Sequence, residues 1–395
     1  MRHPPHHIFQ FTPETLADWL GERGQPKYRA KQVLDWVYGK GEIDPAKMSN
    51  LPAALRDTLA SEMTFLSGPT VAHQVATDGT QKLLVEWPDE LTPGSVSAEE
   101  ATVDHSTRLP ILGESGTPGA MPYSNTARQT ECVMIPSQDT GPTGVPTRRT
   151  ACISSQVGCP VGCKFCASGM GGLDGNLSAG RIIEQIWRLS RLDGVGRISH
   201  IVFMGMGEPL SNFAAVTHAV RTICADWGLG ISARRVTIST VGLPKAIERL
   251  ADKMELPVTL ALSLHAPTDE LRRELIPWSE YTTIDDLLSA CDKWFRKTGR
   301  EITLEYTLLR GVNDSQEQAA ELASLAKRLR ANVNIIRYNE VDGTPFKRPV
   351  TDDVREFQRI LRARSVNAHI RASRGRDIAA ACGQLRHEAA SAGGA

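Results

Sequence analysis

Three closely spaced cysteines are the residues of this chain whose type and spacing most directly imply chemistry. Cys159, Cys163 and Cys166 follow the pattern Cys-x3-Cys-x2-Cys, and Cys152 lies seven residues upstream. Thiolates this close in sequence can bind one inorganic centre. Iron–sulfur clusters are usually closed by four cysteines. Three ligands on a four-iron cluster leave one iron with open coordination, just as a catalytic zinc keeps one exchangeable position. An open iron can bind a substrate.

A structural zinc site, completed by Cys152 or by a histidine, is the simpler alternative for these cysteines. Zinc sites more often use two separated Cys-x2-Cys pairs, so the spacing favours the cluster. The chain has eight cysteines and no recognisable secretion signal, which also indicates a metal site more than a disulfide framework.

Length and composition set limits on the fold and the location. The 395 residues suffice for one large domain with one or two small ones. No apolar run reaches the length of a membrane span, and the sequence around Met1 lacks an apolar leader. We therefore expect a cytoplasmic protein without a membrane partner. Lys and Arg together number 45, as do Asp and Glu, and this balance neither supports nor excludes nucleic-acid binding.

The first 66 residues have helical patterns. Thr12 can cap a helix that has Pro13 at its first position. Apolar residues then recur at helical spacing in residues 28–38, and a third helix is predicted over 53–63. We expect a small N-terminal helical accessory domain over 1–66. Packing against the rest of the chain and contact with RNA are both open as its role.

Strand patterns replace helical ones between residues 67 and 144. Strands are predicted over 82–87 and 131–136. Residues 91–128 are rich in Pro, Gly, Ser, Thr and Ala and have no sustained periodicity, so we interpret them as a polar insertion. A second polar loop covers 137–149. This region is predicted to be a short β extension.

Short apolar runs alternate with amphipathic helical stretches from residue 145 to 380. Helices are predicted over 179–192, 213–226 and 316–330. Such alternation indicates an α/β fold with a parallel sheet. Six or seven units are too few for a closed eight-stranded barrel, so we expect an open or partial one. Strands are predicted near 151–154, 200–205, 235–240, 257–264, 301–309, 332–337 and 368–371.

Polar residues follow several of these strands, at the edge where ligands bind in such sheets. The second strand is followed by Gly205, Gly207 and Glu208; later strands are followed by Ser239 and Thr240, by Ser263, Leu264 and His265, and by Asn339. Together they could bind a molecule with an amine, a carboxylate and a ribose. Taken singly, a strand-end turn or a packed histidine explains them equally well. Cys382 lies in an Ala-rich segment followed by Gly, where it could present a thiol or be a small buried residue.

The motifs resemble those of radical S-adenosylmethionine (SAM) enzymes, and more narrowly the RlmN/Cfr family of RNA adenine methyltransferases. The stretches 152–159, 203–209, 262–267 and 381–385 carry the resemblance to the RlmN type, which methylates carbon 2 of adenine. It extends over nearly the whole chain, including residues 28–32 and 50–52; the insertion at 91–128 departs from it. It implies a partial (β/α)6-type radical SAM barrel, with a core over 145–380 and a C-terminal segment over 381–395.

The resemblance also implies site roles. Cys159, Cys163 and Cys166 would hold a [4Fe-4S] cluster, and two SAM molecules would be used per turnover. Cys382 would carry the methyl group, Cys152 would form a transient disulfide with it, and Glu131 would accept a proton. The implied SAM contacts are Gly207, Glu208, Ser239, Ser263, Leu264, His265 and Asn339.

The implied partners are 23S rRNA, tRNA, and an electron donor of the flavodoxin or ferredoxin kind, with the protein a monomer. Two rival functions stay open: a Cfr-type enzyme that methylates carbon 8 of adenine, and a non-catalytic metal-stabilised RNA-binding protein. Each of the candidate RNA contacts is more readily explained as part of a solvated face. They are Arg148, Arg149, Arg234, Arg235, Arg362, Arg364, Arg371, Arg374 and Arg376.

Overall fold

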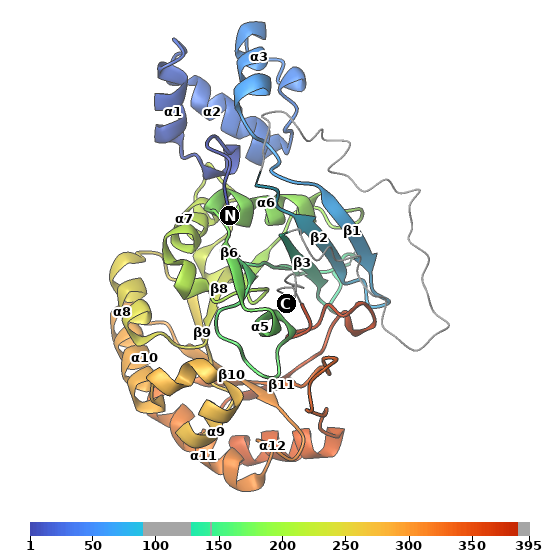
Figure 1. The fold of residues 1–395 in the computed structure, drawn as a ribbon, viewed down its shortest axis with the longest axis vertical. Coiled ribbons are helices and arrows are strands. Elements are labelled where there is room, and N and C mark those ends of the chain that lie inside the picture. Colours follow the sequence, from blue (N-terminus) through green and yellow to red (C-terminus); the bar gives the residue numbers. More distant parts are fainter. Residues whose placement is uncertain (90–127, 143, 386–395) are drawn as a thin grey trace, which may run out of the picture.

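One continuous ten-stranded sheet organises the protein (Figure 1). The computed structural model describes residues 1–89, 128–142 and 144–385. Nearly all of the insertion predicted at 91–128, and residues 386–395 of the predicted C-terminal segment, lie outside the described residues.

The sheet changes from antiparallel to parallel at β4. The pairs β1–β2, β2–β3 and β3–β4 are antiparallel, and every later pair is parallel. Because β1 and β12 are the two ends of the sheet, the barrel is partial, as predicted. In order across the sheet the strands are β1 (Thr70–Val75), β2 (Gln81–Glu86), β3 (Gln129–Pro136), β4 (Arg149–Cys152), β7 (His200–Phe203), β8 (Val236–Thr240), β9 (Thr259–Ser263), β10 (Ile302–Leu308), β11 (Asn332–Arg337) and β12 (Ala368–Arg371).

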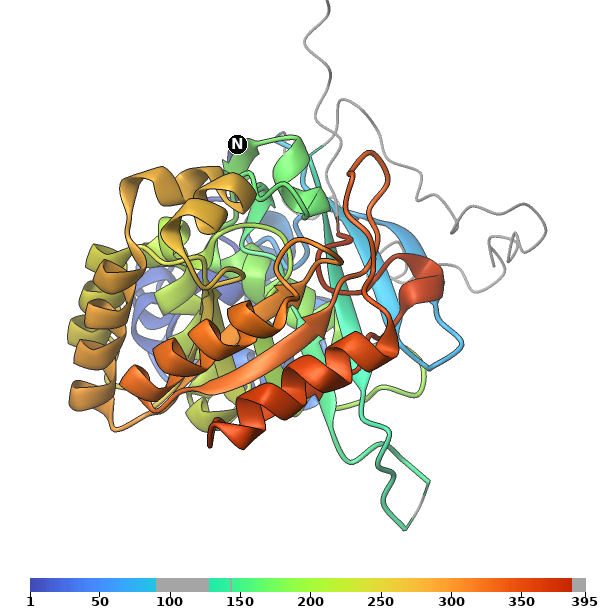
Figure 2. The same ribbon diagram turned by 90° about the horizontal axis from the view of Figure 1, so that it is seen from below.

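Helices cover the outer face of the parallel strands, as the two orthogonal views show (Figures 1 and 2). Their apolar stripes pack on the strands because strand and helix alternate along the chain. The predicted helices at 179, 213 and 316 begin at those residues and end within two residues of the predicted ends. The covering helices are α6 (Ala179–Ser190), α7 (Phe213–Cys224), α8 (Pro244–Lys253), α10 (Ile284–Thr298), α11 (Gln316–Leu329) and α12 (Thr351–Ala363).

Three strands had no counterpart in the sequence-based prediction. β1 is an edge strand of mostly half-buried residues, so its sequence lacks a clear apolar face. The other two, β5 (Gln156–Gly158) and β6 (Leu173–Asn176), form a separate antiparallel pair. Both are short, and together they bracket the cysteine segment, which begins at Cys159.

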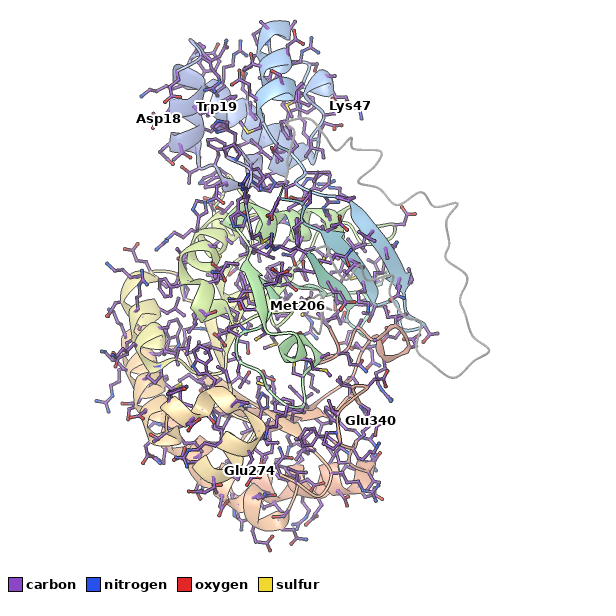
Figure 3. The ribbon with its side chains drawn as sticks, viewed as in Figure 1. Asp18, Trp19, Lys47, Met206, Glu274 and Glu340 are labelled. Carbon is purple, nitrogen blue, oxygen red and sulfur yellow. The ribbon has the colours of Figure 1, made fainter. Side chains whose placement is uncertain are left out.

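The N-terminal region contains three helices, α1 (Pro13–Gly21), α2 (Arg29–Leu34) and α3 (Ala53–Glu62). As predicted, Thr12 caps α1: its side chain accepts a hydrogen bond from the backbone N–H of Thr15, with Pro13 at the first helical position. The helix predicted over 28–38 is interrupted, because Asp35–Lys40 forms a π-helix. In Figure 3, Trp19 and Lys47 lie in this region, well away from Met206 in the core.

A buried polar cluster attaches this region to the core. The Glu184 carboxylate on α6 is 3.1 Å from His7 Nε2 and 2.5 Å from Arg188 Nη2. It also accepts hydrogen bonds from the N–H and Oγ of Ser67. All four side chains are buried, so α6 is covered on both sides and fixes the first residues onto the sheet. The helices of the described residues are all too short or too polar to cross a lipid bilayer.

Candidate metal and cofactor site

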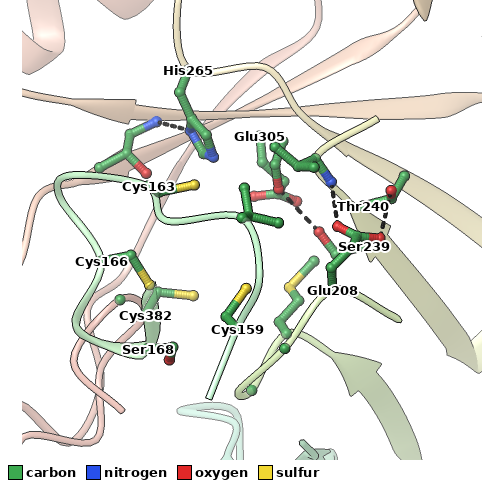
Figure 4. Close-up of a pocket in the computed structure, with 18 of the residues that line it drawn as sticks. Cys159, Cys163, Cys166, Ser168, Glu208, Ser239, Thr240, His265, Glu305 and Cys382 are labelled. Carbon is green, nitrogen blue, oxygen red and sulfur yellow. Dashed lines mark hydrogen bonds between the residues drawn. The ribbon is translucent and has the colours of Figure 1, made fainter. Parts of the chain in front are cut away.

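A pocket opens at the carboxyl ends of the parallel strands (Figure 4). It contains about 850 Å³ of empty space, part of it open to solvent. Its lining brings together residues from five strand ends, the cysteine loop and the C-terminal segment. Those that the sequence had singled out are Cys159, Cys163, Cys166, Gly205, Gly207, Glu208, Ser239, Thr240, Ser263, His265 and Cys382.

The cysteine loop is fixed by backbone hydrogen bonds to three separate parts of the chain. The N–H of Cys159 donates to the Gly172 carbonyl at 2.8 Å, and the N–H of Lys164 donates to the Leu275 carbonyl at 3.0 Å. The N–H of Ala167, which begins the short helix α5 (Ala167–Met170), donates to the Gly383 carbonyl at 2.8 Å. The loop is therefore held to the same C-terminal segment that carries Cys382.

The three cysteines of the loop face one pocket together. Within residues 1–89, 128–142 and 144–385, no three His, Cys, Asp or Glu side chains converge as the ligands of one metal ion. Cys159, Cys163 and Cys166 line the same pocket. Three thiols on one loop are a donor set that fits an iron–sulfur cluster with one iron left open to a ligand.

The chemistry of these thiols also calls for a bound cation. Burial raises the pKa of Cys159 to about 12 and raises the pKa of Cys166. Burial, followed by the neighbouring thiols Cys166 and Cys159, raises the pKa of Cys163 well above its usual range. Because metal ligation requires thiolates, iron would supply the positive charge that keeps these sulfurs deprotonated.

Gly205 and Gly207 shape the loop after β7. A Cβ at Gly205 would lie 2.7 Å from the Ile153 carbonyl, and one at Gly207 would lie 2.7 Å from Gln156 Cβ. Gly207 also has a φ of +101°, which side chains rarely tolerate. The glycines thus allow the loop to pack against the segment that follows β4. The sequence analysis explained Gly205 and Gly207 by the close approach of a ligand, and the structure adds this packing as a second reason for glycine at both positions.

Glu208 lines the pocket, with both carboxylate oxygens engaged by the chain. Oε2 accepts from the Val241 N–H at 2.8 Å, while Oε1 accepts from Thr240 Oγ1 at 2.8 Å and from the Leu210 N–H at 2.9 Å. Burial raises the pKa of Glu208, and these donors oppose that rise. Nearby, the Oγ atoms of Ser239 and Ser263 lie 3.2 Å apart.

His265 has a strained backbone and a neutral ring. Its φ is +58°, and such strain in a non-glycine residue is typical of functional sites. Burial, followed by the Arg272 charge, lowers the pKa of His265 to about 3. Nδ1 accepts a hydrogen bond from the Thr307 N–H, so the ring proton is assigned to Nε2. The adjacent Leu264 instead packs its side chain into the core.

Glu305 was not singled out from the sequence, although it lines the pocket. It lies on β10 beside Ser263 and is 3% exposed. Oε1 accepts a hydrogen bond from Asn334 Nδ2, and Oε2 has no hydrogen-bond partner among the described residues. Burial raises the pKa of Glu305. A buried oxygen without a partner at a pocket wall is what a bound ligand with hydroxyl or amine donors would satisfy, so this residue also fits a polar cofactor.

Cys382 reaches the pocket from the C-terminal segment, close to the cysteine loop (Figure 4). Its carbonyl accepts from Asn339 Nδ2 at 3.2 Å. Asn339 is thus placed against Cys382, and it is not among the residues that line the pocket. Cys152 lies behind the pocket in an apolar patch with Met206 and Ile378. Burial, and next the nearby Cys382, raises the pKa of Cys152 to about 12.

Arg371 lies next to both of these cysteines, at the end of β12. It donates from Nη1 to Met204 Sδ at 3.3 Å. The proximity of Cys382, with smaller contributions from Glu305 and Cys152, raises its pKa. The sequence had grouped Arg371 with candidate RNA contacts, yet it faces the site. Among the other candidates, Arg374 lies 3.7 Å from Asp78, and Arg148, Arg234 and Arg235 are exposed.

Glu131 lies on β3 in a buried ion pair that the sequence did not reveal. Lys82 Nζ on β2 is 2.6 Å from Glu131 Oε1, and the two side chains are 1% and 0% exposed. Lys82 also donates to the Ala379 carbonyl at 3.2 Å. The pair therefore connects the β extension to the segment that leads to Cys382.

Two family models match the chain. Residues 153–323 match the radical SAM superfamily. Residues 6–64 match the N-terminal domain of the ribosomal RNA large subunit methyltransferases. The matched ranges contain the three-cysteine loop and the N-terminal helices respectively.

Curated relatives and a solved structure resemble the chain over almost its full length. A probable dual-specificity RNA methyltransferase RlmN of Rhodopirellula baltica is 40% identical over 96% of this chain and 90% of its own. Another protein with the same description, from Thermosynechococcus vestitus, is 40% identical over 94% of this chain and 95% of its own. The crystal structure of a radical SAM methyltransferase from Sphaerobacter thermophilus is 37% identical, covers 97% and 99% of the two chains, and superposes with a TM-score of 0.81.

Proposed function

The chain belongs to the RlmN family of radical SAM methyltransferases, whose enzymes use a [4Fe-4S] cluster and SAM, and from this premise we propose that it methylates carbon 2 of an adenine in 23S rRNA and in the tRNA anticodon loop. The observation that supports the proposal is that two cysteines beyond the cluster motif are brought close together. Cys382 lines the pocket beside the cysteine loop, and Cys152 packs behind the pocket against Ala380, next to the segment that carries Cys382. The two cysteines are 230 positions apart in sequence (382 − 152).

The target atom explains why such a site is needed. Carbon 2 of adenine is electrophilic and offers no lone pair, so displacement at SAM cannot methylate it directly. When bound, the cluster and SAM supply a methyl group for displacement and a radical for hydrogen abstraction. We assign the cluster to Cys159, Cys163 and Cys166, and SAM to the pocket-lining residues Gly207, Glu208, Ser239, Ser263 and His265, with Glu305 added from the structure. For Leu264 and Asn339, which do not line the pocket, the assignment to SAM rests on the family resemblance alone.

Cys382 is the proposed methyl carrier. Its thiolate takes a methyl group by displacement, which is ordinary chemistry for a thiolate. Loss of one hydrogen then makes this methyl a carbon radical, which adds to carbon 2 and joins protein to RNA. The adenine has to leave its stack to reach the pocket.

Release requires a base and a second thiolate. The adduct loses the ring proton, which Glu131 accepts, and one electron, which would return to the oxidised cluster when that group is bound. The Cys152 thiolate attacks the sulfur of Cys382, so that a disulfide forms while the carbon–sulfur bond breaks. The methylated carbon keeps the electron pair and takes a proton. Burial raises the pKa of Cys152, and the Arg371 charge beside it opposes that rise, which favours the reactive thiolate.

Two cysteine substitutions test the proposal. Cys382→Ala should abolish methyl transfer to RNA, whereas Cys224→Ala, which changes a half-buried cysteine on α7, should not. Cys152→Ala should accumulate a covalent protein–RNA adduct, seen as a slowly migrating band on a denaturing gel. Methylated product from Cys382→Ala above background, or normal turnover without adduct by Cys152→Ala, would rule out the respective role.

The remaining parts of the proposal concern partners and location. We propose a flavodoxin- or ferredoxin-type electron donor, a monomeric enzyme, and a place in the cytoplasm with its RNA substrates. The match of the N-terminal helices to a ribosomal RNA methyltransferase domain supports an RNA-directed role for that region.

A further inference from the structure

Arg272 is a buried cation that has no carboxylate partner in the described part of the chain. It lies on α9 (Asp269–Leu275) and is 1% exposed. Its guanidinium donates from Nη2 to the Val241 carbonyl at 2.5 Å and from Nε to the Leu264 carbonyl at 3.3 Å. Asp269, on the same helix, raises the pKa of Arg272 by its charge but forms no ion pair with it, and its carboxylate accepts a hydrogen bond from the Ile284 N–H. Burial lowers the pKa of Arg272 to about 10, which leaves it charged at neutral pH.

An unpaired buried charge is costly. Removing one partner of a buried ion pair is strongly destabilising, because the remaining charge is left uncompensated. Two carbonyl dipoles compensate a full charge only partly. The buried Arg181 and Arg188 on α6, by contrast, share a site with the Glu184 carboxylate. Arg272 has no such carboxylate beside it among the described residues, which indicates that a negative group outside the polypeptide compensates its charge.

The surroundings of Arg272 show where that group lies. The cysteine loop is joined to the end of α9 by the hydrogen bond from Lys164 to Leu275. Cys163 packs against the apolar cluster that contains Val241 and Leu275. Val241, whose carbonyl accepts the hydrogen bond from Arg272, lines the same pocket as Cys163. The guanidinium thus lies behind the loop that holds the cluster.

The charge of the cluster matches this requirement. An oxidised [4Fe-4S] core carries two positive charges, so three thiolates bring the total to one negative charge, and reduction adds a second. We propose that Arg272 is the buried counter-ion of the iron–sulfur cluster and raises its reduction potential. It is a positioning residue: it clamps the ends of β8 and β9 together and stabilises the reduced, more negative cluster. This inference depends on the cluster that the family uses, and not on the identity of the RNA substrate.

The test is the reduction potential of the reconstituted cluster, measured by redox titration with electron paramagnetic resonance detection. Arg272→Gln removes the charge and keeps a hydrogen-bond donor, and Arg272→Lys keeps the charge. Arg273→Gln is the matched control, because it removes the same charge from the exposed neighbour on the same helix. The readout does not depend on methyl transfer.

We expect Arg272→Gln to lower the equilibrium constant for one-electron reduction of the cluster at least tenfold. This corresponds to a reduction potential that is lower by about 59 mV. Arg272→Lys and Arg273→Gln should each stay within threefold of the wild type. A change of less than threefold in Arg272→Gln would overturn the proposal. If Arg272→Gln loses iron too readily to be titrated, the iron content of the two variants is compared instead. The proposal expects Arg272→Lys to retain iron. Loss of iron from both Arg272→Gln and Arg272→Lys would overturn the proposal and indicate that Arg272 is a purely structural clamp.

Discussion

Replacing Lys82 by methionine tests whether the buried pair with Glu131 is a true ion pair. The two charged atoms are 2.6 Å apart and both side chains are buried. Methionine has a similar volume and no charge, so it would leave the Glu131 carboxylate uncompensated, at a cost of roughly 3–5 kcal/mol. The hydrogen bond from Lys82 to the Ala379 carbonyl would be lost as well, at about 1 kcal/mol.

A second substitution separates these two contributions. In Lys82→Met/Glu131→Gln no buried charge remains, so mainly the Ala379 hydrogen bond is missing. The double variant should therefore be about 2–4 kcal/mol more stable than Lys82→Met. Lys47→Met is the matched control: Lys47 is 62% exposed and lies 3.6 Å from Glu42, so its loss should cost under about 1 kcal/mol.

Urea denaturation at neutral pH, followed by circular dichroism, gives these differences from the midpoints and slopes. Cluster-free protein should be used, because a bound cluster would add its own stabilisation. A cost of less than about 1 kcal/mol for Lys82→Met would refute the reasoning, as would a double variant no more stable than the single one. Either result would mean that the Glu131 carboxylate is solvated or protonated in the folded protein.

Three further substitutions give distinct outcomes. His265→Asn keeps a residue that tolerates positive φ. Because the pKa of His265 is about 3 in the folded protein, the unfolded state binds more protons below about pH 6.5, and the unfolding free energy of the wild type should fall by about 1.4 kcal/mol per pH unit more than that of the variant as the pH is lowered from 6.5. Urea titrations in which both proteins lose unfolding free energy equally per pH unit would contradict this. Gly207→Ala should weaken SAM binding at least tenfold by equilibrium dialysis, because its Cβ meets Gln156 at 2.7 Å in a strained φ; unchanged affinity would show that the loop adapts. Glu184→Gln should cost about 3 kcal/mol of unfolding free energy by leaving Arg188 without its carboxylate, and a cost below 1 kcal/mol would show that this cluster does not fix the N-terminal region.

Much of the site could be predicted from the sequence because its signals are local. The three cysteines lie within eight positions of one another, so their spacing alone indicates a shared centre. The residues after each strand converge because parallel strands end at one edge of a sheet. For Ser239, Ser263 and His265 this argument places the side chains at the pocket, and the structure confirms it.

The groups that sequence reasoning missed are buried charges. Lys82, Arg272 and Glu305 are ordinary charged residues by type, and such residues are normally exposed. Lys82 is the second residue of β2, and Arg272 is followed by the exposed Arg273, so nothing local distinguishes these two residues from ordinary exposed charges. Their burial follows from contacts between distant segments, such as β2 with residue 379 and α9 with the ends of β8 and β9. The edge strand β1 was missed for a related reason. It is a strand because it pairs with β2, and its own sequence has no clear strand pattern.

The central claim is that the methyl group reaches carbon 2 of adenine through Cys382, and one labelling measurement tests it most directly. Anaerobically reconstituted protein would be given a reductant, unmodified large-subunit ribosomal RNA and SAM with a fully deuterated methyl group. Nucleoside mass spectrometry should then show 2-methyladenosine with two deuterium atoms in its methyl group, because one is abstracted on Cys382 and a proton replaces it on release. A methyl group with all three deuterium atoms, or one at carbon 8, would contradict the account.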